Sequence, residues 1–144
     1  MPGLDSLPES IRSAIEEPAL SAGAKQSAID AAAKAHGVQF PADYAAFLRG
    51  SNGAEFTLGD NYVVLFSLEA LAAENEPDEE IFPPHLFVFG GNGASEKFAF
   101  DKRERPHQIV VVPHFKPDDD EALPQGTTFH GFLERVLAGE AFDG

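Results

Sequence analysis

Cysteine is absent from this chain of 144 residues, and basic residues are scarce. Without cysteine there is no disulfide, no thiolate-bound zinc and no cysteine nucleophile, and a reducing compartment is favoured. Ten Lys and Arg stand against 24 Asp and Glu, so the formal net charge is −14. Because sequence-independent nucleic-acid binding needs basic side chains that displace counterions from phosphates, this composition disfavours a nucleic-acid partner.

Long apolar runs, internal repeats and dividing linkers are missing as well. No stretch approaches the roughly 18 uncharged apolar residues of a membrane span, and the N-terminus lacks the basic and apolar regions of a secretory signal. We therefore expect a cytoplasmic protein with no membrane partner. With no repeat and no linker, residues 1–144 are expected to form a single domain.

The chain does contain enough apolar material for a sizeable core. Hydrophobic residues make up 43% of it and include 13 Phe, which is too apolar for a disordered acidic tail. Apolar residues at helical spacing, bounded by capping residues, Pro or Gly, predict helices. The first helix combines Leu7, Ile11 and Ile15 with the spacing of a capping box from Ser6 to Glu9 and a stop at Pro18. Helices are thus predicted over residues 6–17, 22–36, 41–50, 67–71 and 128–138.

Between the helical segments the apolar period changes to two. Residues 55–58 and 62–66 flank a Gly-Asp-Asn turn and predict a hairpin. Residues 86–89, 98–100 and 109–112 are typical of central strands covered on both faces. Helices at both ends of a mostly antiparallel sheet indicate the α+β class.

No arrangement of residues predicts catalysis, a metal site or a cofactor. The glycine-rich residues 90–96 lead into a strand rather than a helix, so a hairpin turn is favoured over a phosphate loop. Ser51 lies in a helix-stop context rather than a nucleophile elbow. An acid-dependent hydrolase has only the number of carboxylates in its favour. The histidines never show metal-ligand spacing at His36, His85, His107, His114 and His130.

Two segments concentrate the negative charge, and we name them the first and second acidic segments. Together they hold nine of the 24 acids. Clustered carboxylates repel one another with no evident benefit to folding, whereas across an interface they attract a basic protein. We interpret them as candidate partner-binding residues; a solvated surface that keeps molecules apart is the alternative. The first segment contains Glu74, Glu76, Asp78, Glu79 and Glu80, and the second contains Asp118, Asp119, Asp120 and Glu121.

Three motifs together resemble the SUKH superfamily, which is named partly after a fungal cell-wall assembly regulator. Residues 40–53, FPADYAAFLRGSNG, are similar to the family's "LPxDYxxFL…NG" signature, with Phe40 in place of the usual Leu. Residues 88–93 and 98–101 resemble its strand-turn-strand motif, and residues 128–133 resemble its terminal "sFxeFL" helix. The motifs occur in the family's order and cover about residues 24–137.

The resemblance implies an α+β domain with about six strands and a non-enzymatic binding role. Bacterial members of the family are immunity proteins against a co-encoded toxin, often a nuclease or deaminase, and fungal members are regulatory adaptors. Our first hypothesis is therefore a bacterial immunity protein that blocks a basic toxin domain, and the alternative is an adaptor for an endogenous protein. In the signature, helical spacing predicts a buried Tyr44 and Phe47, and the pair Asn52 and Gly53 is expected to cap the preceding helix.

Overall fold

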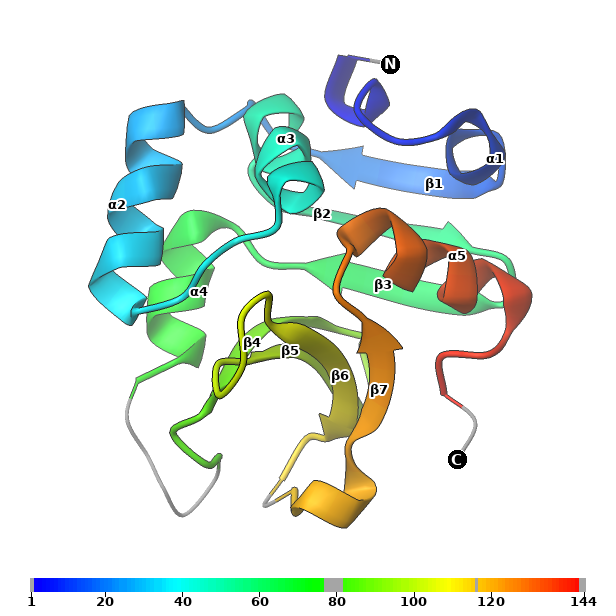
Figure 1. The fold of residues 1–144 in the computed structure, drawn as a ribbon. Helices are drawn as coiled ribbons and strands as arrows, with labels where there is room; N and C mark the ends of the chain where they lie inside the picture. The colour runs from blue at the N-terminus through cyan, green and yellow to red at the C-terminus, as the bar shows by residue number, and fades with distance from the viewer. Residues whose placement is uncertain (1, 77–81, 116, 143–144) are drawn as a thin grey trace.

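A single seven-stranded antiparallel sheet organises the chain (Figure 1). The computed structural model describes residues 2–76, 82–115 and 117–142. Each strand pairs with its neighbours in sequence, so the spatial order runs from β1 to β7 without a crossover. The strands are β1 (Ile15–Leu20), β2 (Ala54–Leu58), β3 (Asn61–Leu65), β4 (Leu86–Gly91), β5 (Glu96–Asp101), β6 (Gln108–Pro113) and β7 (Leu123–Gly126).

The helices begin and end where the sequence places capping residues. Ser67 and Thr128 accept backbone N–H groups at the starts of α4 and α5, while Gly37 and Gly139 end α2 and α5 in the left-handed conformation. None of the helices within the described ranges has both the length and the apolar character of a membrane span. The helical elements are η1 (Pro2–Leu4), α1 (Glu9–Arg12), α2 (Gln26–His36), α3 (Ala42–Gly50), α4 (Leu68–Glu74), η2 (Asp119–Glu121) and α5 (Phe129–Ala138).

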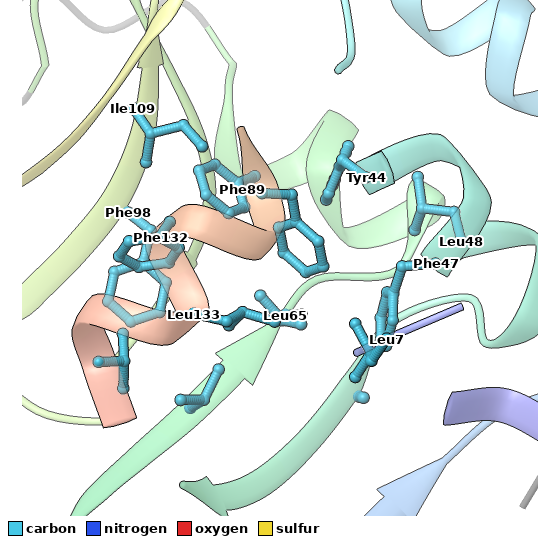
Figure 2. Packing of buried hydrophobic residues seen from close by; sticks show 14 of the residues in the cluster. Leu7, Tyr44, Phe47, Leu48, Leu65, Phe89, Phe98, Ile109, Phe132 and Leu133 are labelled. Atoms are coloured by element: carbon cyan, nitrogen blue, oxygen red, sulfur yellow. The ribbon is translucent and has the colours of Figure 1, made fainter. Parts of the chain in front are cut away.

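The main core lies between the helices and one face of the sheet (Figure 2). Tyr44 and Phe47 from α3 and Phe132 and Leu133 from α5 are at most 1% exposed, which confirms the burial expected from helical spacing. Aromatic rings fill much of this space. The Tyr44 ring makes edge contacts with Phe89, Phe100 and Phe129 at centroid distances of 5.3–5.4 Å.

The two halves of the sheet differ on the opposite face. Across β4, β5 and β6 that face carries a second buried cluster, which includes Val88, Ala99 and Val110 and is covered by Phe82 and Ala122. Burial on both faces confirms the central strands expected from continuous apolar runs. Across β2 and β3, by contrast, the same face presents exposed polar and aromatic side chains.

The helix predicted over residues 6–17 is wrong beyond its first turn. Leu7 and Ile11 are buried as expected, but α1 ends at Arg12 and residues from Ile15 form the edge strand β1 instead. Ser6 does not cap the helix, because Pro8 occupies the N-cap position. Pairing with β2 overrides the local helical pattern, and an edge strand tolerates Pro18.

The sheet also has one strand more than the resemblance implies. The strand β7 reads Leu-Pro-Gln-Gly and has no apolar alternation that would reveal it. It pairs with β6 at Ile109, Val110 and Val111 and forms the second edge of the sheet. Because proline has no N–H to donate, Pro18 and Pro124 interrupt both edges and oppose pairing with another chain.

Candidate partner-binding surface

The first acidic segment begins where α4 ends. Glu74 is the last residue of that helix, and Glu74 and Glu76 are both exposed. Neither forms an ion pair with any residue in the described part of the chain. Asp78, Glu79 and Glu80 lie outside the described residues. The part that is described therefore offers two carboxylates to the solvent.

Asn75, between these two acids, fixes the end of α4 against the sheet. Its side-chain Oδ1 accepts a hydrogen bond from the Val88 N–H at 2.7 Å, and its Nδ2 donates to the Val88 carbonyl at 2.8 Å. The Asn75 amide thus supplies the backbone hydrogen bonds of Val88 at a point where β3 no longer pairs with β4. The start of the first acidic segment is consequently held at a defined place on β4.

The second acidic segment forms a short turn of its own. Asp118 Oδ1 accepts the Glu121 N–H at 3.0 Å, and Glu121 Oε1 accepts the Asp118 N–H at 3.2 Å. This reciprocal capping box stabilises η2. The expectation that these carboxylates bring no benefit to folding is therefore wrong for Asp118 and Glu121.

Asp119 belongs to a small network of charges. The Arg103 guanidinium binds Asp101 at 2.6 Å and Asp119 at 3.2 Å, and His85 Nε2 lies 3.6 Å from Asp119 Oδ1. Hydrogen bonds from Arg103 hold the pKa of Asp101 below its usual range. Asp101 thus stabilises the fold above the pKa of an unfolded Asp, and that contribution is lost as the pH falls through its lowered value.

The fold brings the two acidic segments to the same end of the molecule. His85, which follows the first segment in the sequence, lies beside Asp119 of the second. Phe82, also after the first segment, and Ala122, directly after the second, pack against the same buried cluster. In Figure 1, η2 lies at the lower edge of the view, and α4 runs downward and ends above it and to its left. Six exposed carboxylates are described there: Glu74, Glu76, Asp118, Asp119, Asp120 and Glu121.

A hollow of about 850 Å³ lies beside the first acidic segment, between the ends of α2 and α4 and the start of β4. Apolar side chains such as Phe82 and Leu86 line it together with charged groups of both signs. Lys102, one of its bases, already donates to the carbonyl of His36 at 3.3 Å. The mixed charge gives this hollow no preference for a basic or an acidic ligand.

Two of the histidines, His36 and His114, line this hollow. His107 is buried: its Nε2 accepts the Gln39 N–H at 3.0 Å, and its Nδ1 lies 2.6 Å from a backbone carbonyl, so its role is structural. His36 packs against the ring of Phe87, and His114 is exposed. Within the described ranges, no three His, Cys, Asp or Glu residues are grouped as metal ligands would be.

Asp43, in the "ADY" part of the signature, joins α3 to α5. Its carboxylate accepts the N–H of Phe129 at 3.2 Å and the N–H of His130 at 2.9 Å. These are the first two residues of α5, where backbone N–H groups have no partner within the helix. The sequence gives no sign of this cap, because the acceptor and its donors are 86 and 87 positions apart.

We expect Asp43→Ala to lower the free energy of unfolding by about 1–3 kcal/mol, because two helix N–H groups lose their acceptor. Asp43→Asn keeps one acceptor oxygen and should lose less. Urea denaturation followed by circular dichroism measures both variants. An alanine variant within about 0.5 kcal/mol of the wild type would show that this contact contributes little.

Asn52 also acts across the fold, and not as the cap of α3 that its position suggests. Ser51 holds the C-cap position of α3. The Asn52 Oδ1 instead accepts the Leu68 N–H at 2.8 Å, and its Nδ2 donates to the Glu69 carboxylate, so the side chain caps α4. Asp43 and Asn52 of the signature thus each connect one helix to another within the fold.

The comparison with protein families assigns most of the chain to one family. The family model described as SMI1 / KNR4 family (SUKH-1) matches residues 23–135, which span more than half of the chain. The match runs from just before α2 to within α5. Among curated proteins, none matches the chain.

Proposed function

This chain belongs to the SMI1 / KNR4 family (SUKH-1), and from that premise we propose that it is an immunity protein. It binds a basic toxin domain, of the nuclease or deaminase type, and neutralises it by stoichiometric occlusion. The proposed role is binding alone, with no catalytic step and no cofactor. An adaptor that binds an endogenous protein is the alternative within the same family.

The observation that supports an acidic binding surface is the convergence of the two acidic segments at one end of the fold. Enzymes that act on nucleic acids are basic around their clefts, because their substrates are polyanions. A cluster of exposed carboxylates attracts such a cleft over a distance and aligns the encounter. The Arg103 guanidinium carries one positive charge and faces two carboxylates, Asp101 and Asp119. This network therefore keeps a net negative charge.

Removing three acids at this end is expected to slow association with the partner. We choose Glu74→Gln, Glu76→Gln and Asp120→Asn together, because none of these side chains has a hydrogen bond or ion pair among the described residues. The association rate at low salt should fall by about tenfold. The difference from wild type should shrink as the Debye length shortens from about 10 Å at 0.1 M to 3 Å at 1 M salt.

The immunity function predicts that a large reading frame beside this gene ends in a toxin-like domain, and that domain is the partner for this measurement. The matched control, Asp5→Asn, Asp30→Asn and Glu134→Gln, changes the net charge equally at exposed acids outside the two segments. Equal association rates for the two triple variants would show that total charge alone matters. A wild-type chain that neither binds the domain nor protects growing cells from it would contradict the immunity function and favour the adaptor.

A further inference from the structure

The outer face of β1, β2 and β3 carries an exposed aromatic side chain. Tyr62 on β3 is 44% exposed, although most large apolar and aromatic residues of the described chain are buried. It lies directly across from Thr57 on β2, which in turn lies across from Glu16 on β1. The helices cover the other face of these strands, so this face is open to a partner.

Tyr62 is held in place before any partner arrives. Its hydroxyl donates a hydrogen bond to Glu55 Oε1 at 2.7 Å. Its ring lies against Gly93 in the turn between β4 and β5, where an added Cβ would come within 2.9 Å of Tyr62 Cδ2. Tyrosines fixed in this way bury large area in an interface at little cost in conformational entropy.

Three exposed carboxylates lie on these strands without a basic partner. Glu16, Glu17 and Glu55 are exposed, and none forms an ion pair within the described part of the chain. The hydrogen bond to Glu55 and the negative charges of Glu55 and Glu17 raise the pKa of the Tyr62 hydroxyl. The second acidic segment differs from this face, because Arg103 already neutralises part of its charge.

We propose that this sheet face, formed by Glu16, Glu17, Glu55, Thr57 and Tyr62, binds an arginine or lysine side chain of the partner protein. The cation lies over the exposed side of the Tyr62 ring and pairs with the Glu55 carboxylate. A second copy of this chain would bring the same negative charge to the face and be repelled. The partner's identity as a basic toxin domain rests on the proposed function; the cation site does not.

A basic peptide tests the cation site without the toxin. Acetyl-Arg-Ala-Arg-amide is titrated into the ¹⁵N-labelled protein while backbone amide shifts are followed by NMR. We expect the largest shifts at Glu55, Thr57 and Tyr62, and an affinity about fivefold to tenfold lower for Tyr62→Ala. Tyr62→Phe keeps the ring and should retain most of the affinity. Glu55→Gln should weaken binding more than the control Glu134→Gln on α5.

Shifts centred on residues 118–121, or an unchanged affinity of Tyr62→Ala, would overturn the cation site. Urea denaturation of Tyr62→Ala shows whether the variant is folded, and Tyr62→Phe provides the comparison if it is not.

The toxin domain then separates this site from the proposed function. If wild type binds it and Tyr62→Ala dissociates about tenfold faster, both proposals are supported. If wild type binds it and Tyr62→Ala dissociates at the same rate, the immunity function stands and the sheet face is wrong. If wild type does not bind it, the immunity function is contradicted, and the peptide titration alone decides the cation site.

Discussion

Phe47→Ala is expected to lower the free energy of unfolding by about 3–5 kcal/mol. The Phe47 ring on α3 is 0% exposed (Figure 2). Its centroid lies 5.5 Å from that of the Phe129 ring on α5. Truncation removes buried apolar surface and leaves a cavity between two helices that are themselves fixed by other contacts. A domain of this length has about 7–20 kcal/mol of stability in total, so the loss is a large part of it.

Urea denaturation at 25 °C gives this difference if unfolding is two-state, with one midpoint by fluorescence and by circular dichroism. Phe47→Leu serves as the graded control: it keeps much of the volume and should lose less than half as much. A Phe47→Ala variant within about 1 kcal/mol of wild type would show that the centre of the core lies elsewhere.

Gly53→Ala is expected to destabilise the protein by about 2–5 kcal/mol. Gly53 has a φ of 88°, in the left-handed region, where a side chain costs about 1–2 kcal/mol. A Cβ at this position would also lie 2.7 Å from the Ser67 nitrogen and 2.8 Å from the Leu65 carbonyl oxygen. These are backbone atoms at the end of β3 and the start of α4, so they cannot move aside as a flexible side chain would.

Gly37→Ala separates the two contributions. Gly37 has a φ of 62° at the end of α2, and an added Cβ there would meet nothing within 4 Å. Gly37→Ala should therefore lower the free energy of unfolding by about 1–2 kcal/mol, from the left-handed conformation alone. Gly53→Ala should lose more unfolding free energy than Gly37→Ala. That difference is the cost of the steric clash between the added Cβ and the backbone of Leu65 and Ser67. Equal losses for the two variants would mean that the backbone around Gly53 adjusts freely.

The sequence by itself determined the elements whose signals are local. Helix ends depend on residues within one turn, and the structure ends or begins α2, α4 and α5 at such residues: Gly37, Ser67, Thr128 and Gly139. The apolar face of α5 and the covered strands β4 to β6 follow from side-chain periods of 3.6 and 2. The helical period also predicted correctly that Tyr44 and Phe47 on α3 are buried.

Only the tertiary structure decided which distant groups meet. The helical spacing of residues 7–15 competes with pairing of Ile15 opposite Leu58, and the sheet prevails because its hydrogen bonds and buried surface come from partners far along the chain. In the same way Asp43 caps α5, and Glu55 fixes Tyr62. A local pattern records which face of an element is apolar. It does not record which element will cover that face, because the covering element lies far along the chain.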